Sequence, residues 1–185
     1  MTILTHRQAG LDIDSAYHQA RILLLVNAVS RTPGAGRKLD GLTKLAKLDF
    51  LVRYPTLAAR VSEGLGNDSR LRPSDDDYRE TESPMIRYKY GPWDNRYYPV
   101  IGALVGKGLL AYTRGGKGSV ALRPTAMGRK IVSELQGAPA WMETAERCEA
   151  VAEHVGKLSG NGLKELIYEK LPEILDRPHR ELIRP

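Results

Sequence analysis

The clearest hydrophobic pattern in the chain runs from residue 85 to residue 136. Residues 85–90 alternate apolar with charged side chains, and this period of two predicts a half-buried strand. After the break at Gly91 and Pro92, Asp94 is a candidate N-cap for a helix that ends near Lys107. Pro99 fits this helix only in its first turn, where it has no N–H partner to lose. The apolar stripe of the helix consists of Tyr97, Ile101, Leu104 and Val105.

A glycine-rich hairpin is predicted after this helix. Two short alternating runs, 109–114 and 119–123, are joined by a tip, 114–118, whose glycines permit positive φ angles. Thr125 is then a candidate cap for a further helix with Met127, Ile131 and Leu135 on one side. Helix, hairpin and helix in this order predict a winged helix-turn-helix, in which the hairpin is the wing.

The amino-terminal part of the chain is predicted to be helical. A helix from Asp12 or Asp14 to about Ser30 is apolar on nearly every side at residues 22–26, so we expect it in the core. Residues 31–38 are interpreted as a flexible basic linker, because the spacing of a phosphate-binding loop is absent. Asp40 is expected to cap a second helix. This helix is predicted to bury Leu42, Leu45, Leu48 and Val52 and to leave Lys44 and Lys47 outside.

A polar loop and two more helices complete the expected fold. Residues 67–83, with three adjacent aspartates, are predicted to form an exposed loop. Helices over 140–158 and 163–171 carry apolar stripes that cover either the winged domain or a partner, and residues 176–185 are expected to be loose unless a partner binds them. The expected class is α+β, mostly helical. Two regions are expected, a helical segment with the winged helix over 1–137 and a helical extension over 138–185.

Charge is distributed unevenly along the chain. Residues 31–60 carry seven Lys/Arg and two Asp/Glu, a net charge of +5, and residues 85–131 carry nine and one, a net charge of +8. Residues 67–83 and 132–185 each carry a net charge of −3. The positive charge therefore belongs to the predicted winged helix, where it favours contact with phosphates.

Cysteine content and hydropathy favour a cytoplasmic protein. Cys148 is the single cysteine, which excludes an internal disulfide and a cysteine-rich zinc site. No apolar run is long enough for a signal peptide or a membrane span. The four histidines are scattered, and no nucleophile motif is present. We therefore expect a cytoplasmic protein that is not an enzyme, has no cofactor or metal and binds no membrane.

The winged-helix interpretation yields two sets of candidate binding residues. The predicted recognition helix offers few polar groups to base edges, so DNA contact is expected at phosphates. Gly102 and Gly106 either let another helix approach closely or permit tight packing within the domain, whereas tyrosines commonly anchor protein interfaces. The DNA-binding candidates are Lys44, Lys47, Arg96, Arg114 and Lys117, and the partner-binding candidates are Tyr97, Tyr98, Ile101 and Trp141.

Three stretches of the chain also carry a family resemblance. They are KLDFLVRYP (47–55), RYKYGPWDNRYYPVIGALVGKGLL (87–110) and LKELIYEKLPEI (163–174). Together they resemble the small middle component of bacterial ABC-three-component systems, which overlap with Lamassu-type anti-phage defence. The resemblance implies a non-catalytic winged-helix adaptor that acts with an SMC/Rad50-like ATPase and an effector subunit, often a nuclease. YKYGPWDNRYY alone is also similar to winged antitoxin-like proteins.

Two functional hypotheses follow. The leading one is an adaptor subunit of a defence complex that links the SMC/Rad50-like ATPase to the effector and lies near double-stranded DNA without sequence preference. The alternative is a free-standing transcriptional regulator or antitoxin that binds operator DNA as a dimer. They differ in DNA specificity, because only the regulator requires a preferred sequence.

Overall fold

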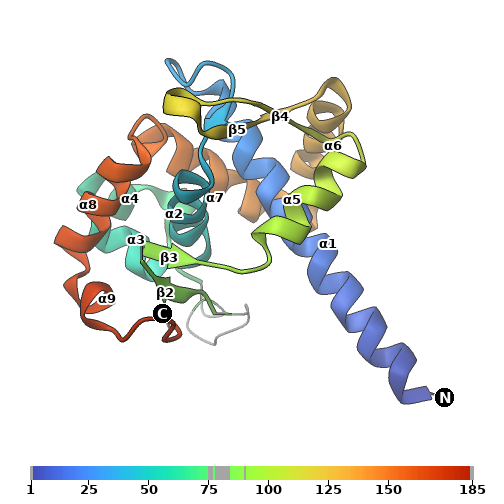
Figure 1. Cartoon of the computed structure of the whole chain (residues 1–185), viewed down its shortest axis with the longest axis horizontal. Helices are drawn as coiled ribbons and strands as arrows, with labels where there is room; N and C mark the ends of the chain where they lie inside the picture. Colours follow the sequence, from blue (N-terminus) through green and yellow to red (C-terminus); the bar gives the residue numbers. More distant parts are fainter. Residues whose placement is uncertain (1, 75–76, 78–83, 90, 184–185) are drawn as a thin grey trace.

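The computed structural model describes residues 2–74, 77, 84–89 and 91–183, with side chains from residue 15 onward. The described part is α+β and mostly helical, which confirms the predicted class (Figure 1). Its first half comprises α1 (Thr2–Arg31), β1 (Leu39–Asp40), α2 (Leu42–Arg53), α3 (Pro55–Val61), α4 (Glu63–Asn67), β2 (Ile86–Tyr88) and β3 (Gly91–Trp93). Its second half comprises α5 (Tyr97–Gly106), β4 (Leu110–Arg114), β5 (Val120–Pro124), α6 (Ala126–Gly137), α7 (Pro139–Val155), α8 (Gly160–Lys170) and α9 (Pro172–Asp176).

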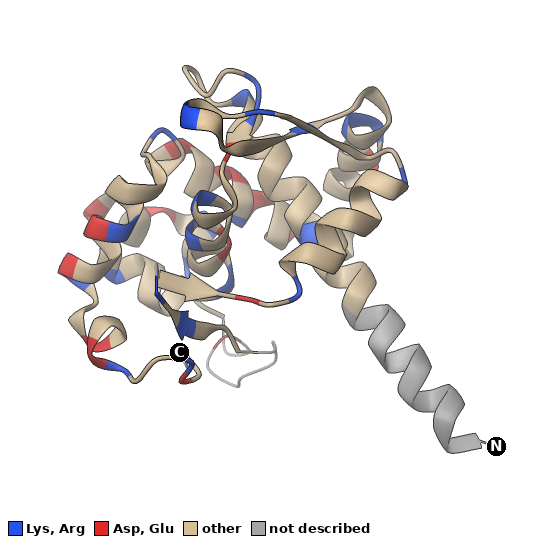
Figure 2. Cartoon of the chain, in the orientation of Figure 1, with Lys and Arg blue, Asp and Glu red and all other residues tan. Residues whose placement is uncertain are grey.

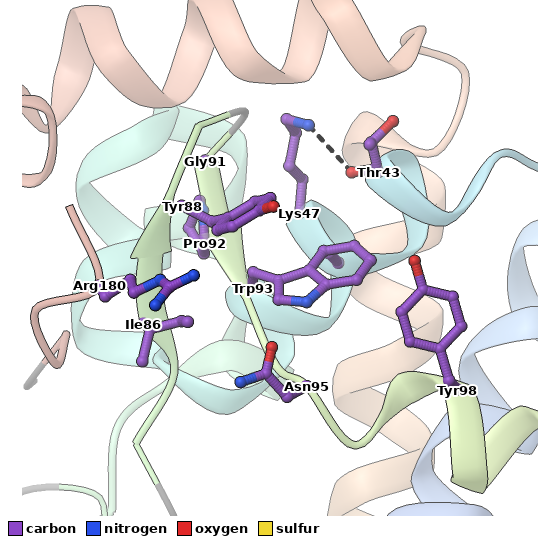
Figure 3. A pocket seen from close by; sticks show the side chains of 11 residues that line it. Thr43, Lys47, Ile86, Tyr88, Gly91, Pro92, Trp93, Asn95, Tyr98 and Arg180 are labelled. Carbon is purple, nitrogen blue, oxygen red and sulfur yellow. Dashed lines mark hydrogen bonds between the residues drawn. The ribbon is translucent and has the colours of Figure 1, made fainter.

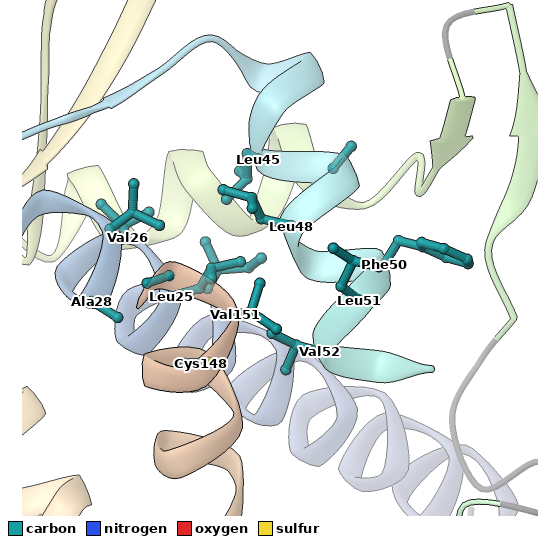
Figure 4. Packing of buried hydrophobic residues seen from close by; sticks show 14 of the residues in the cluster. Leu25, Val26, Ala28, Leu45, Leu48, Phe50, Leu51, Val52, Cys148 and Val151 are labelled. Carbon is teal, nitrogen blue, oxygen red and sulfur yellow. The ribbon is translucent and has the colours of Figure 1, made fainter. Parts of the chain in front are cut away.

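The core forms around α1, α2 and α7. Residues 22–26 of α1 are all buried, as their apolar pattern predicts, because α2, α5, α6 and α7 all pack against this helix. Figure 4 shows Leu25 of α1 close to Leu48 of α2 and Val151 of α7. Helix α1 begins at Thr2, so the predicted start at Asp12 or Asp14 is wrong.

A three-stranded antiparallel sheet in the order β1-β5-β4 lies at one end of the molecule. Its β4–β5 pairing runs from Leu110 opposite Pro124 to Arg114 opposite Val120, and confirms the predicted hairpin. The predicted cap at Asp40 is wrong, because Gly41 precedes α2 and provides no side-chain cap. Asp40 instead belongs to β1, which pairs with β5 and brings this carboxylate to the hairpin tip.

The second sheet is a hairpin of β2 and β3, extended by the carboxyl-terminal segment. The Ile183 N–H donates to the Met85 carbonyl at 2.7 Å, and the Arg87 N–H donates to the Glu181 carbonyl at 2.8 Å. The Tyr54 hydroxyl also donates to the Ile183 carbonyl at 3.0 Å. The prediction that residues 176–185 are loose is therefore wrong for the described residues up to 183. Burial of the Ile183 side chain explains why the segment docks.

The acidic stretch 67–83 is more ordered where it is described than the sequence predicts. Leu71 is buried, and Asp77 receives two hydrogen bonds from the Arg147 guanidinium, at 2.8 and 2.6 Å. Asp75, Asp76 and residues 78–83 lie outside the described residues. The described part of the stretch is thus attached to α7 rather than exposed along its length.

The helices after residue 137 share the hydrophobic core of the helices before it. Helix α6 ends at Gly137, where the sequence predicts a boundary, and α7 then packs along α1 and α2. Cys148 and Val151 of α7 are fully buried in the same cluster as Leu25 of α1. The apolar stripe of α7 therefore covers the chain's own core.

Candidate nucleic-acid interface

The hairpin between β4 and β5 presents two exposed cations on a rigid tip. Arg114 and Lys117 are both exposed, and Lys117 has a left-handed φ of 51°. The Asp40 carboxylate accepts hydrogen bonds from the Gly116 N–H at 2.7 Å and from the Ser119 hydroxyl at 2.6 Å. A Cβ atom at Gly115 would collide with Asp40 and Ser119, so this close approach requires glycine. The tip is therefore fixed without using its own charged side chains.

A basic groove of about 970 Å³ lies beside this hairpin, between α1, the connector 32–38, the sheet and α6. Among the described residues, no carboxylate lines it. The connector and the hairpin appear together at the top of Figure 2, where lysine and arginine are blue. The Lys38 ammonium donates to the Arg114 carbonyl at 2.7 Å, which ties the connector to the hairpin. The cations that line the groove are Arg31, Arg37, Lys38, Arg123 and Arg129.

Sequence reasoning did not single out any of these five cations. Residues 31–38 are predicted as a linker, and the pairing of β1 with β5 is what places that linker against α6 and the hairpin. The signal that pointed to them was the net charge of the two segments, +5 and +8, and the fold brings five of those cations to this groove.

Lys44 and Lys47 do not lie on the outer face predicted for them, and that prediction is wrong. The Lys44 ammonium is buried and donates to the Gly156 carbonyl at 2.6 Å, at the carboxyl end of α7, where the helix dipole favours a cation. Lys47 is 2% exposed and donates to the Thr43 carbonyl at 3.0 Å. Burial, together with the nearby charge of Lys164, lowers the pKa of Lys47 to about 8.

Replacing Lys47 with methionine is expected to raise the free energy of unfolding by about 1–3 kcal/mol near neutral pH. The pKa of Lys47 is depressed in the folded state, from 10.5 to about 8, so below pH 8 folding carries the full cost of burying the ammonium. Between these values the folded chain releases the proton first, and the wild type gains stability as the pH rises. Urea unfolding should therefore show a smaller difference in the free energy of unfolding between Lys47→Met and the wild type near pH 9.5 than near pH 7.

The matched control for this change is Lys170→Met, because Lys170 is exposed. We expect no pH-dependent gap between this variant and the wild type. A Lys47→Met protein that is less stable than the wild type near neutral pH would show that the bond to Thr43 outweighs the cost of burial.

A buried ion network attaches α5 to α1 and α2. The Asp49 carboxylate is fully buried and accepts from Arg21 Nε at 2.7 Å and from the Tyr97 hydroxyl at 2.8 Å. Arg53 Nη1 lies 3.7 Å from Asp49 and 2.9 Å from Asp94. Because Tyr97 is the first residue of α5, this network fixes where the helix starts relative to the core.

Arg96 and Asp94 also belong to this network. Arg96 donates from Nε at 2.9 Å and from Nη2 at 2.6 Å to the Asp94 carboxylate, which also accepts from the Arg96 backbone N–H at 2.9 Å. The DNA-binding candidate Arg96 is therefore about one-third exposed and bound to a carboxylate, unlike the wing cations. The prediction that Asp94 is the N-cap of α5 is wrong, because Arg96 occupies the N-cap position directly before Tyr97.

The partner-binding candidates divide into buried and accessible side chains. Tyr97 and Ile101 are 2% and 1% exposed, so the prediction that they anchor a partner is wrong. Tyr98 is 65% exposed. Trp141 is half-buried and stacks on Tyr17 of α1 with ring centroids 5.2 Å apart. Only Tyr98 among the four offers most of its side chain to another molecule.

The outer face of α5 has almost no side-chain polar groups. Tyr98, Pro99, Gly102 and Gly106 are exposed along it. A Cβ atom at Gly102 or at Gly106 would meet nothing within 4 Å, so neither glycine is needed for packing inside the described part of the domain. Glycine in a helix costs roughly 1 kcal/mol relative to alanine. These positions are therefore open to close approach by another molecule.

An aromatic pocket of about 530 Å³ lies between the start of α5, the β2–β3 hairpin and α2. Tyr88, Trp93 and Tyr98 line it, and in Figure 3 the Trp93 indole lies between the other two rings. Lys47 of α2 and Arg180 of the carboxyl-terminal segment also line the pocket. Sequence reasoning placed Lys47 and Tyr98 in different candidate sites, whereas the fold brings them to one pocket.

The chain has no detectable match among known proteins: no family model, no curated protein and no solved structure matches it. Within the described residues, no three His, Cys, Asp or Glu side chains gather as a group that could hold a metal ion. No helix among those described is long and apolar enough to cross a bilayer.

Proposed function

We propose that this protein is a winged-helix adaptor subunit of an anti-phage defence complex that binds duplex DNA through phosphates. The element order supports the winged helix. Helix α1, strand β1, helix α2, helix α5 and the β4–β5 hairpin occur in this order, with other elements between α2 and α5, and β1 completes the sheet on the far edge of β5. Residues 55–93 are an insertion between the two helices of the helix-turn-helix, and α5 takes the place of the recognition helix.

The observation that carries the DNA-binding part of this proposal is the basic groove. Its described lining residues include five cations and no carboxylate, although Arg31 lies 3.7 Å from Glu149 of α7. The exposed wing cations Arg114 and Lys117 lie on the adjoining hairpin. Lysine and arginine side chains that neutralise several phosphates give affinity that depends on salt and not on sequence. The groove and the wing together form the DNA-binding surface in this proposal.

The face of α5 favours the adaptor over the regulator. Sequence readout in the major groove needs side chains that hydrogen-bond to base edges. Along the exposed face of α5, only the Tyr98 hydroxyl offers such a group, because Pro99, Gly102 and Gly106 have none. Bare backbone and an exposed tyrosine ring suit close contact with a protein surface better than base readout.

The resemblance to the middle component of three-component systems supports the choice of complex. The three resembling stretches, 47–55, 87–110 and 163–174, are far apart in the sequence, but α2 packs against both β3 and α8. They therefore form one contiguous body around α2. In the proposal, an SMC/Rad50-like ATPase and an effector subunit are the partners.

Selection from a random duplex library is the experiment that tests this function. We expect the purified chain to enrich no motif and to bind duplex DNA with an affinity that falls steeply between about 50 and 200 mM salt, since phosphates provide the contacts. The reduced affinity at high salt is the internal control for phosphate binding. Enrichment of a palindromic motif would replace the adaptor by the regulator.

A further inference from the structure

Three rings of the aromatic pocket, those of Tyr88, Trp93 and Tyr98, form a row with nearly regular spacing, which His179 continues outside the lining residues. Ring centroids lie 5.2 Å apart from His179 to Tyr88, 6.0 Å apart from Tyr88 to Trp93, and 6.0 Å apart from Trp93 to Tyr98. Tyr88 is 37% exposed and Tyr98 is 65% exposed, so two of these rings offer much of their surface to a ligand. Rings arranged in this way suit a ligand with flat, stackable groups.

The charges of the pocket select an anionic ligand. Lys47 and Arg180 both line it, and none of the other lining residues that the structure describes is an aspartate or glutamate. Figure 3 shows the Arg180 guanidinium beside Ile86 and the Lys47 side chain rising from α2 next to Thr43, so the two cations flank the rings. An aromatic cage for a methylated ammonium group is excluded here, because two lining cations would repel it.

We propose that this pocket binds a nucleobase with its attached phosphate, as presented by single-stranded nucleic acid. The rings of Tyr98 and Tyr88 stack with bases, and Trp93 forms the floor between them. The exposed Arg180 binds the phosphate, and the buried Lys47 ammonium adds positive charge behind the pocket wall without contacting the ligand. Asn95, also a lining residue, offers an amide to a base edge. A free nucleotide has the same chemistry and is the second possible source.

This pocket is separate from the groove proposed for duplex DNA. The two share no lining residue, and they lie at different ends of α5: Tyr98 is in its first turn, and the hairpin follows its last. Stacking on the pocket rings requires an unpaired base, whereas the groove and wing require only phosphates.

The test compares a fluorescein-labelled oligo-dT of about 15 nucleotides with an abasic phosphodeoxyribose oligomer of equal length. Both have the same charge, and only the first has bases. Fluorescence anisotropy with the full chain should show oligo-dT binding about five-fold or more tightly than the abasic oligomer, since each stacked base contributes to affinity. Equal affinities for the two oligomers would overturn the proposal.

Variants assign the base-dependent binding to the pocket. Tyr98→Ala and Arg180→Glu alter exposed lining residues and should reduce oligo-dT affinity, with Tyr98→Ala removing the preference over the abasic oligomer. Tyr112→Ala is the matched control for the base preference, because Tyr112 is a tyrosine 54% exposed on β4 outside the pocket. Since β4 belongs to the wing, this control is judged by the ratio of the affinities for the two oligomers, which should not change. A preference for bases that survives in Tyr98→Ala would overturn the assignment.

Two further arms identify the source of the ligand and the competing class. In the first, thymidine monophosphate competes with oligo-dT. If it displaces oligo-dT at a comparable concentration of nucleotide, the pocket is supported and its ligand is a free nucleotide. In the second, a capped acidic peptide with phenylalanine side chains is tested. If the peptide binds and needs Tyr98 to do so, while oligo-dT does not bind, the nucleotide proposal is overturned. A variant reversed at Arg114 and Lys117 should keep the base preference, so failure of duplex binding at the wing is distinguishable from failure here.

Discussion

Replacing Asp49 with asparagine is expected to lower the free energy of unfolding by about 3–5 kcal/mol. The Asp49 carboxylate is fully buried between Arg21, 2% exposed, and Arg53, whose side chain is 1% exposed. Asparagine has nearly the same shape and keeps a hydrogen-bond acceptor, but it leaves two buried guanidinium groups with less compensating charge. Urea unfolding at neutral pH measures the loss.

The pH dependence of the same variant provides a second check. Burial raises the pKa of the Asp49 carboxyl, but the charges of Arg21 and Arg53 and the hydrogen bonds from Arg21 and Tyr97 outweigh it, so the net pKa is lowered. A lowered folded-state pKa stabilises the protein above the unfolded pKa of about 3.9, and the effect is lost as the pH falls through the folded value. The difference in the free energy of unfolding between the wild type and Asp49→Asn should therefore become smaller at acidic pH.

The matched control is Asp176→Asn, which neutralises an exposed carboxylate at the end of α9. This change should alter stability by about 0.5 kcal/mol or less. If Asp49→Asn is as mild as this control, the network does not hold α5 on the core, and the position of α5 depends on apolar packing alone.

Local sequence signals were sufficient for the elements around the wing. Glycines between two alternating runs predicted the hairpin, and Thr125 predicted the start of α6, where its hydroxyl accepts from the Gly128 N–H at 2.9 Å. Pro99 lies in the first turn of α5, as its missing N–H requires. Each of these predictions depends on contacts between residues close in the sequence.

Long-range contacts account for the errors in α2. A helical pattern assigns Lys44 and Lys47 to the outside, because the apolar residues of α2 lie on the other face. The actual neighbours of Lys44 come from far along the chain: the carbonyl that receives its ammonium is 112 residues away, at Gly156. No periodicity within α2 contains that information. The pairing of β1 with β5 was missed for the same reason.

The two adjacent tyrosines of α5 show how far the site was predictable. Successive residues of a helix differ in direction by about 100°, so one of two neighbours faces the core when the other faces solvent. The sequence makes both Tyr97 and Tyr98 binding candidates, but it does not show that the buried Asp49 carboxylate accepts a hydrogen bond from one of the two hydroxyls. That contact buries Tyr97 and leaves Tyr98 to line the aromatic pocket.

Reversing both wing charges, with Arg114→Glu and Lys117→Glu, is expected to weaken duplex DNA binding about ten-fold or more near 0.1 M salt. The slope of log affinity against log salt should decrease by about 2, since each lost phosphate contact removes about one released ion. Stability should not change, because both side chains are exposed and the tip is anchored by Asp40 instead. Filter binding over a salt series and urea unfolding measure the two quantities.

The matched control reverses two exposed cations elsewhere, Arg60→Glu on α3 and Lys170→Glu on α8, for the same change of four charges. Screening limits the reach of a surface charge to about 10 Å at 0.1 M salt, so these reversals should leave duplex binding nearly intact. In cells with the proposed complete system, the wing variant should lose protection in a plaque assay while the subunit still co-purifies with its partners. Unchanged duplex affinity in the wing variant would remove the wing from the DNA-binding surface, and loss of co-purification would make the hairpin a protein-binding element.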